Sequence, residues 1–486
     1  MALPASGVIS IGNLRTEFSG PTPSALSNYY RGGAYVPNTP TNASVPTSGV
    51  ISLSNFYNAS SQVGFIGMLV GGTFNTGSQL NGIGFDSSGN VYSYGGGGTG
   101  NALAKYNSNG SLQFQKSISL GTNLECVQIK VDSSGNTYGA GSYTSGGSTF
   151  PHIVKYDSSG NLSWGYTLSA TGLTGNFFGC ELDSSNNLHA VGSVNITGVT
   201  SGTAMVVAKI NSSGALQWIR NIDIPAQGTG DFARGVGVDS SGNVYVTGSL
   251  NVSIPPSYTR IFVAKFNSSG TLQWQRTLQT STTTFNTPYD ITADTSGNSY
   301  ATYIDNSGIP GITKFDTNGN ISWQRTIGSG SFIANQIGKS VVVDTTNGFV
   351  YVKLNNGFSI VIFKLNVSNG TAVWVREIAA SPNIGLVPTG IALSTDLNSY
   401  SVVASNLSGL NPGLSSFKFP TDGTKTGTFT ITGSNTIIYS VSSFTSTAAT
   451  LSLLTSSATV TSPSISLAAA NPTVITGTST SYVTPV

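Results

Sequence analysis

The chain carries very little charge for its length. Only 8% of its 486 residues are Asp, Glu, Lys or Arg, and the formal net charge is +2. A nucleic-acid-binding surface needs clustered Lys and Arg side chains to neutralise phosphates, so this composition indicates no nucleic-acid partner. No stretch approaches 18 consecutive apolar residues, so the sequence predicts no membrane-spanning helix.

Residue types that perform catalysis or bind metals are also scarce. The two histidines, His152 and His189, lie far apart in sequence, and Glu occurs only four times. No group of His, Cys, Asp and Glu has metal-ligand spacing, so we predict no catalytic residue, no metal and no cofactor. Asp231 and Asp290, with Arg234 nearby, could in principle serve glycoside chemistry, but loop capping is the simpler interpretation. We therefore expect that the protein is not an enzyme.

There are only two cysteines, and the start of the chain has no basic segment followed by an apolar one. We therefore expect no ordinary secretory signal. Cys126 lies six residues before the nearest repeated Asp and Cys180 lies three before it, so their strand positions differ. Both cysteines are interpreted as small core residues rather than as a disulfide.

What the sequence has in abundance is repetition. An apolar-Asp-x-x-Gly/Asn-Asn-x-apolar signature recurs with spacings of 46, 51, 56, 55, 50 and 50 residues. The repeated Asp is Asp86, Asp132, Asp183, Asp239, Asp294 and Asp344, and a degenerate copy of the signature has Ser394 at this position. A second signature, Lys-aromatic-Asn/Asp-x-x-Gly-x-apolar-x-Trp, follows each of them, as at Lys265–Trp274. This period is typical of four-stranded propeller blades.

Each signature predicts a tight hairpin. Asp-Ser-Ser-Gly suits a type I turn with the Gly at positive φ, and one carboxylate per turn is too few for a calcium site. The tryptophans stand at one register and are predicted to pack between blades: Trp164, Trp218, Trp274, Trp323 and Trp374. The repeated Lys is predicted to be solvated or hydrogen-bonded within its strand, the alternative being a ring of cations that binds a polyanion.

The predicted fold is all-β: a seven-bladed β-propeller of four-stranded antiparallel blades at residues 61–425. A small N-terminal docking segment (1–60) precedes it and an uncharged β tail (426–486) follows. We expect residues 65–71 to be the outer strand of the last blade, antiparallel to residues near Phe417, because an open ring exposes a row of unpaired backbone groups.

The two flanking segments differ from the propeller in composition. Residues 6–14 (Ser-Gly-Val-Ile-Ser-Ile-Gly-Asn-Leu) nearly repeat as residues 48–56, and each copy predicts an extended piece followed by a Ser-capped helical turn. Residues 1–60 are too few for a good core, so Tyr29, Tyr30, Phe56 and Tyr57 are predicted to be exposed docking residues. No charge follows Lys425, and Ser/Thr alternate there with Val, Ile and Leu. This alternation predicts strands that pair with the propeller or with another subunit.

The connections on one face of the propeller are long and variable, as in residues 139–150, 168–178, 250–260 and 278–289. Rigid aromatic side chains among small polar residues suit recognition of glycans or proteins. The candidate recognition residues are Tyr143, Phe150, Phe177, Phe178, Tyr258, Phe285 and Tyr289. The alternative is that these loops vary without functional meaning.

The repeated pattern, over residues 65–425, resembles the bacterial and phage β-propeller repeat of the SBBP type. Residues 6–14 and 26–33 resemble the N-terminal module of tailed-phage virion proteins, especially those of marine phages and cyanophages. This resemblance implies a virion structural protein, assembled in the host cytoplasm and carried on the particle, but no assigned site residue.

We therefore expect a non-enzymatic particle appendage, such as a tail fibre or adhesin. Its N-terminal segment would bind other virion proteins and its propeller a host glycan or protein, with homo-oligomers possible. The alternatives are a bacterial secreted or cell-surface lectin-like propeller and a capsid decoration protein.

Overall fold

The structure is a computed structural model of the whole chain. The described residues are 3, 8–18, 21–22, 25–31, 35–36, 44–56, 65–70, 79–97, 100–108, 111–119, 123–196, 202–223, 230–252, 258–279, 287–305, 308–327, 340–355, 359–381, 386–394, 399–406, 414–421, 423, 427–432, 435–441, 446–448, 452–455, 459–461, 466–469, 473–476 and 480–485.

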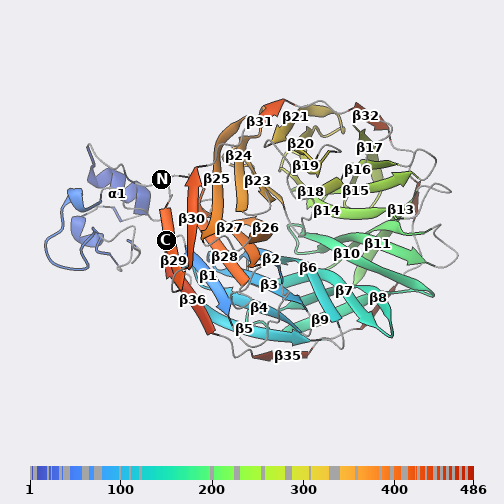
Figure 1. Ribbon diagram of the computed structural model, residues 1–486, viewed down its shortest axis with the longest axis horizontal. Coiled ribbons are helices and arrows are strands. Elements are labelled where there is room, and N and C mark those ends of the chain that lie inside the picture. The colour runs from blue at the N-terminus through green and yellow to red at the C-terminus, as the bar shows by residue number, and fades with distance from the viewer. Residues whose placement is uncertain are drawn as a thin grey trace.

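The described strands form seven antiparallel sheets arranged as blades around a ring (Figure 1). Blade 1 begins with β2 (Gln79–Phe85), β3 (Val91–Gly97), β4 (Gly100–Tyr106) and β5 (Leu112–Ser119). Blade 2 begins with β6 (Asn123–Val131), β7 (Thr137–Ser145), β8 (Ser148–Tyr156) and β9 (Leu162–Ser169). Blade 3 begins with β10 (Leu173–Leu182), β11 (Leu188–Ile196), β12 (Ala204–Ile210) and β13 (Leu216–Asp223).

The remaining blades follow the same order from the axis outward. Blade 4 begins with β14 (Phe232–Val238), β15 (Val244–Val252), β16 (Tyr258–Phe266) and β17 (Leu272–Gln279). Blade 5 begins with β18 (Thr287–Ala293), β19 (Ser299–Ile304), β20 (Pro310–Phe315) and β21 (Ile321–Ile327). Blade 6 begins with β22 (Val341–Asp344), β23 (Phe349–Asn355), β24 (Ser359–Asn366) and β25 (Ala372–Ser381). Blade 7 begins with β26 (Leu386–Leu393), β27 (Ser399–Asn406), β28 (Leu414–Pro420) and β1 (Phe65–Val70).

The predicted fold class is wrong about the composition of the blades, whereas the predicted pairing of the tail with the propeller is confirmed. Six sheets contain five strands and the sheet of blade 6 contains six, because strands of the C-terminal tail pair with the fourth strand of every blade. The tail strands are β29 (Gly427–Thr432), β30 (Asn435–Val441), β31 (Ser446–Ala448), β32 (Ser452–Thr455), β33 (Thr459–Thr461), β34 (Ser466–Ala469), β35 (Thr473–Thr476) and β36 (Thr480–Pro485). The physical reason is that a fourth strand left at the rim has an unpaired row of backbone groups, which another strand satisfies.

The first repeated signature forms the predicted hairpin turn between the two inner strands of a blade. In blade 4, Oδ1 of Asp239 accepts hydrogen bonds from the backbone N–H groups of Ser241 and Asn243, both at 2.9 Å. Its Oδ2 accepts from Nδ2 of Asn243 at 2.8 Å and from the hydroxyl of Tyr245 at 3.0 Å. The Asp thus caps its own turn and fixes the next strand, which explains why the pattern extends from Asp to Tyr.

The second signature joins each blade to its neighbour. Nε1 of Trp274 in blade 4 donates to the carbonyl of Thr317 in blade 5 at 3.0 Å. Gly319 follows in the same turn, with φ +78°, and a Cβ there would lie 2.7 Å from the Trp274 ring. Trp164, Trp218 and Trp323 make the same hydrogen bond to the next blade. The predicted packing role of these tryptophans is therefore confirmed.

The repeated lysines belong to the same joint. Nζ of Lys314 donates to the carbonyl of Val367 in the next blade at 3.0 Å and lies 5.4 Å from the ring centroid of Tyr300. Lys155 and Lys364 make equivalent hydrogen bonds to the following blade. These contacts confirm the interpretation of the lysine as a hydrogen-bonded strand residue. They also engage the lysine ammonium groups, which a polyanion would have to bind.

The predicted closure of the ring by residues 65–71 is confirmed. β1 pairs antiparallel with β28, and Ile66 lies opposite Phe417. β1 is nevertheless the fourth strand of blade 7 and not its outermost one, because β36 pairs along its other edge. The two ends of the propeller are thereby held in one sheet, and the end of the tail covers the junction.

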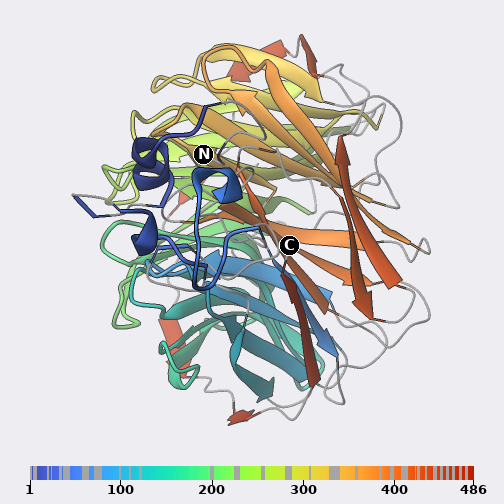
Figure 2. The same ribbon diagram turned by 90° about the vertical axis from the view of Figure 1, so that its left-hand side faces the viewer.

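The N-terminal segment forms a small module with a core of its own. It contains α1 (Ile11–Phe18) and the 3₁₀ helices η1 (Leu26–Asn28) and η3 (Leu53–Phe56). At the start of α1, the N–H of Ser10 donates to Oδ1 of Asn13 and the N–H of Asn13 donates to Oγ of Ser10, which confirms the predicted Ser cap of this helix. At η3, the N–H and the hydroxyl of Ser52 both donate to Oδ1 of Asn55. Figures 1 and 2 place this module on the rim of the ring, outside the blades.

Two of the predicted docking aromatics are internal to this module. Tyr29 and Phe56 are fully buried, and Phe18 packs against both at 6.3 Å between ring centroids. The prediction that Tyr29 and Phe56 are exposed is therefore wrong. The two sequence copies supply apolar residues to one shared cluster, which also includes Leu14, so the segment builds a core that its length alone did not suggest.

A pair of glycines tests the joint between blades. Gly308 and Gly319 both close turns at nearly equal positive φ, but a Cβ at Gly308 would meet nothing within 4 Å. We expect Gly308→Ala to cost about 1 kcal/mol of unfolding free energy, from backbone strain alone. Gly319→Ala should cost about 3 kcal/mol, because the new methyl also displaces the Trp274 ring. Urea unfolding followed by tryptophan fluorescence measures both, and equal losses would show that the ring contact contributes nothing.

Candidate functional site

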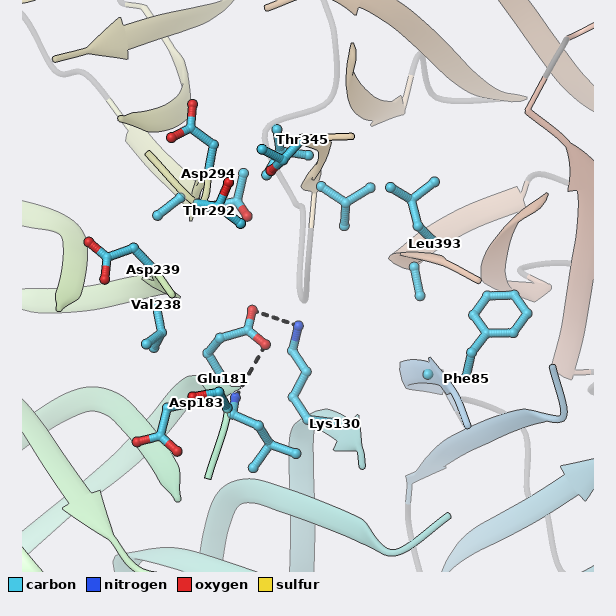
Figure 3. A pocket seen from close by; sticks show the side chains of 18 of the residues that line it. Phe85, Lys130, Glu181, Asp183, Val238, Asp239, Thr292, Asp294, Thr345 and Leu393 are labelled. Carbon is cyan, nitrogen blue, oxygen red and sulfur yellow. Dashed lines mark hydrogen bonds and ion pairs between the residues drawn. The ribbon is translucent and has the colours of Figure 1, made fainter. Parts of the chain in front are cut away.

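The seven inner strands end around one central cavity of about 470 Å³ (Figure 3). Each blade contributes the residues that lead into its first hairpin turn, so the cavity lies on the propeller axis. Its lining is dominated by small and aliphatic side chains from β2, β6, β10, β14, β18, β22 and β26. A site on this axis is therefore shaped by all seven blades at once.

One level of the cavity is set by the residue two positions before each repeated Asp. These residues are Gly84, Lys130, Glu181, Thr292, Val342 and Ala392, which line the cavity, and Gly237, which has the same sequence position in blade 4. The glycines are required by close approach of the inner strands: a Cβ at Gly84 would lie 2.6 Å from Cγ2 of Val131, and one at Gly237 would lie 2.8 Å from Cα of Thr292. The narrow ring thus leaves room for large side chains at only two adjacent blades.

Those two blades supply an ion pair. Nζ of Lys130 lies 2.8 Å from Oε2 of Glu181, and the backbone N–H of Leu182 donates to Oε1 of Glu181 at 3.2 Å. Both charged side chains remain about one fifth exposed, at 19% and 18%, and Figure 3 shows them meeting in the cavity. The pair is neutral overall and offers one donor and one acceptor group, which suits a small polar ligand better than a polyanion. Sequence reasoning missed it, because the two residues are 51 positions apart.

The other carboxylates near the cavity are directed away from it. Asp183, Asp239 and Asp294 point into their own hairpin turns in Figure 3. In blade 3 a histidine replaces the usual Tyr, and Nε2 of His189 lies 3.3 Å from Oδ2 of Asp183. Burial alone would raise the pKa of the Asp183 carboxyl, but hydrogen bonds from His189 and Asn187 outweigh it and hold that pKa well below its usual range. This Asp is therefore a structural anion.

The carboxylates considered for glycoside chemistry also have structural roles. Oδ1 of Asp231 accepts the backbone N–H of Asn251 at 2.9 Å. Oδ2 of Asp290 accepts the N–H groups of Ser340 at 2.8 Å and Val341 at 3.1 Å, which links blade 5 to blade 6. Arg234 stands on a β-bulge of β14, and its side chain is exposed. These contacts support the capping interpretation of both Asp residues.

A buried lysine was not anticipated from the sequence. Lys353 in β23 is fully buried, and burial lowers its pKa to about 7 although the carboxylate of Asp290 opposes that shift. The signal that could have revealed it is positional, since Thr247 and Thr302 stand at the same place in blades 4 and 5. Lys353 is thus a charged residue at a position where blades 1 to 5 have uncharged residues, which indicates a local exception.

The predicted recognition aromatics do not form one exposed surface. Phe177 is fully buried and Tyr289 is 7% exposed, while Phe178 packs against Phe232 at 6.1 Å between ring centroids. Tyr143 and Phe150 lie opposite each other in β7 and β8 and are partly buried. Phe285, the side chain of Tyr258 and Tyr57 of the docking set lie outside the described residues.

The predicted loops that carry these aromatics are shorter than expected. Residues 139–150 belong to β7 and β8 apart from a turn at Gly146 and Gly147. Phe178 and Tyr289 occupy β-bulges of inner strands. The hairpin signatures mark only one end of each strand. The length of the strands was therefore underestimated, and the length of the loops that join their opposite ends was overestimated.

No three His, Cys, Asp or Glu side chains among the described residues lie close enough together to hold a metal ion. Cys180 is a buried free thiol in the core between blades 2 and 3, as predicted, and the side chain of Cys126 lies outside the described residues. None of the described helices has the length and hydropathy needed to cross a membrane.

Comparison with known proteins supports the fold. The family model described as SBBP, a beta-propeller repeat, matches residues 217–254, which run from strand β13 to the end of β15. This match is to the repeat predicted from the sequence, whereas the expected likeness of the N-terminal module to virion proteins finds no support there. No curated protein matches the chain.

Several solved structures resemble it at low identity. A protein from Lactobacillus plantarum is 12% identical, with 64% of this chain and 94% of that chain covered and a TM-score of 0.39. A protein of unknown function from Dyadobacter fermentans is 9% identical, with 74% and 98% covered and a TM-score of 0.41. An ulvan lyase of a polysaccharide lyase family is 10% identical, with 72% and 93% covered and a TM-score of 0.39. Likeness at this level says nothing about activity.

A buried histidine predicts a pH dependence of stability. His152 is fully buried, and burial lowers its pKa to about 3 from an unfolded value of 6.5. Between these two values the unfolded chain binds a proton that the folded chain does not, so stability falls as the pH drops below 6.5. At pH 5 the loss from this group is about 2 kcal/mol relative to pH 7.

The matched variant is His152→Val, since Val206 and Val361 hold the same position in blades 3 and 6. Urea unfolding of both proteins at pH 7 and pH 5 measures the difference, because all other titrating groups are common to the two. We expect the variant to lose about 2 kcal/mol less than the parent between these pH values. Equal losses would mean that His152 titrates normally in the folded protein.

Proposed function

We propose that this chain is a non-enzymatic structural protein of a tailed-phage particle. Residues 1–60 would attach to other virion proteins, and the propeller would be displayed outward, where it recognises a glycan or protein of the host surface. The protein would thus be assembled in the host cytoplasm and leave with the particle.

The observation that carries the docking part is a pair of exposed valines. Val8 is 94% exposed and Val50 is 92% exposed, and they occupy the same position in the two copies of the repeated N-terminal motif. Among the described residues, the only other exposed large hydrophobic is Val373, at 46%. Full burial of one valine in an interface is worth about 1.5 to 3 kcal/mol. Two such side chains on one small module favour a docking surface.

The module's internal structure supports the same division of roles. Tyr29 and Phe56 hold the module together from inside, so they stabilise the docking surface without forming it. The hydroxyl of Tyr30 donates to the carbonyl of Gly49, next to Val50. This hydrogen bond ties the residues after η1 to the second copy of the motif and helps to fix the position of Val50.

The propeller's chemistry favours display over catalysis. The carboxylates of Asp231, Asp239 and Asp290 accept backbone hydrogen bonds that hold turns or neighbouring blades. Glu181 is paired with Lys130 in the central cavity. Such groups are poor general bases, because proton uptake would break the contacts that stabilise them. For recognition, the predicted aromatics that remain partly accessible are Tyr143 and Phe150, near the Gly146–Gly147 turn, and Phe178.

The docking proposal predicts that removing the two exposed valine side chains releases the protein from particles. We expect Val8→Ser combined with Val50→Ser to lower incorporation at least about tenfold, because about 3 kcal/mol of apolar contact is lost. Quantitative mass spectrometry of purified particles, normalised to a capsid protein, measures incorporation.

Val373→Ser is the matched control, since it replaces an exposed valine in β25 of the propeller. It should incorporate like the parent. Normal incorporation of the double variant would move docking elsewhere in the chain. Absence of the unaltered protein from purified particles would refute the virion assignment itself.

A further inference from the structure

The tail passes once around the outside of the ring. β30 pairs with β25 of blade 6, and the following tail strands then pair in turn with β21, β17, β13, β9, β5 and β1. The tail therefore visits blades 6, 5, 4, 3, 2, 1 and 7, in the reverse of their chain order, and always antiparallel to the fourth strand. In Figure 1 its red segments lie on the rim, outside β21, β17 and β5.

The step from one blade to the next is constant. Each fourth strand has an aromatic residue opposite the repeated Lys, which is Trp in five blades, Phe114 in blade 1 and Phe65 in blade 7. The tail residues that face the position three residues after this aromatic are seven positions apart from one blade to the next. The facing pairs are Glu377–Ser440, Thr326–Thr447, Thr277–Leu454, Asn221–Thr461, Thr167–Ala468, Ser117–Ile475 and Met68–Tyr482. No residue is gained or lost over the complete turn.

Seven residues also suit the geometry of the rim. A nearly extended chain of seven residues spans about 23 to 25 Å, which includes a short strand and the link to the next blade. The shortest strands, β31 and β33, have three residues each. The links between the strands from β31 to β36 have three or four residues, so little slack is available.

The side chains at these seven tail positions have no common type. They are Ser, Thr, Leu, Thr, Ala, Ile and Tyr, and their partners on the blades range from Glu to Met. What the seven places share is the antiparallel main-chain pairing. Strand addition of this kind derives its affinity from backbone hydrogen bonds and its specificity from side-chain pockets. Here the constant step takes the place of such pockets.

We propose that residues 435–485 form a belt of seven interchangeable strand-addition units, whose assignment to blades is set by the seven-residue step and not by side-chain identity. Each unit covers the outer edge of one blade, and the belt as a whole fastens the ring from outside. The occupant of the seven outer edges is thus this chain's own tail, and its last unit covers the junction between β1 and β28.

Two deletions of equal length test whether the seven-residue step or the identity of the side chains assigns the tail units to the blades. Deleting residues 442–448 removes one unit, so every later unit should move one blade upstream along the tail's path and leave β1 uncovered. Deleting residues 480–486 leaves β1 uncovered in the same way but moves nothing. The full chain is otherwise kept in both variants.

Engineered cysteines report the assignment, since directly opposed residues of an antiparallel pair lie about 4.5 to 5.5 Å apart at Cα, within disulfide reach. Ala468→Cys should cross-link with Thr167→Cys in the parent and in the 480–486 deletion, but not with Asn221→Cys. In the 442–448 deletion it should cross-link with Asn221→Cys and not with Thr167→Cys. The two deletion variants should melt within about 3 °C of each other.

Three outcomes overturn the proposal. One is a cross-link to Thr167→Cys that persists after deletion of residues 442–448. Another is the absence of both cross-links in that variant while tryptophan fluorescence shows a folded propeller. The third is unfolding of the 442–448 deletion under conditions in which the 480–486 deletion remains folded, since interchangeable units would leave the two equally stable.

Discussion

The structure depends on one constraint: every β-strand edge exposes backbone N–H and C=O groups that need partners. A ring of blades satisfies this need between the strands of each sheet but leaves one free edge per blade at the rim. The described strands meet the need twice, first by pairing β1 with β28 to close the ring and then by pairing the tail with each fourth strand. An uncharged Ser/Thr-rich segment suits the second task, because charged side chains in a belt of this kind would discourage pairing.

The repeat signatures can be understood as the parts of one joint. The turn Asp organises its own hairpin and orients the following Tyr, as Asp239 and Tyr245 show. The Lys and Trp of the third and fourth strands then reach the turn of the next blade, where Gly319 leaves room for the Trp274 ring. The chemistry-bearing residues are thus largely committed to architecture. Among the described residues, a neutral ion pair on the axis and two valines on the N-terminal module remain accessible, and the valines carry the docking proposal.

Much of this could be predicted from the sequence, because the determining contacts are local. The hairpin turns, the tryptophan register and the pairing of residues 65–71 near Phe417 each follow from a short pattern. The belt was not predicted, because the alternation of Ser and Thr with apolar residues predicts strands without identifying the edges with which they pair, and the seven facing positions share no residue type. The same holds for the Lys130–Glu181 pair, which adjacent blades bring together, and for the module core, in which Tyr29 and Phe56 come from distant positions in the sequence. The loop lengths were overestimated because a turn signature locates one end of a strand and not the other.

The central claim is that the tail is part of every blade. Hydrogen–deuterium exchange of the unaltered protein, resolved by mass spectrometry over residues 427–485, tests this most directly. The account predicts that backbone amides of the tail strands exchange at least on the order of a hundredfold more slowly than in an unstructured chain, together with the fourth strands that they cover. Exchange of the whole tail at the rate of an unstructured chain, while the inner strands of the blades remain protected, would contradict it.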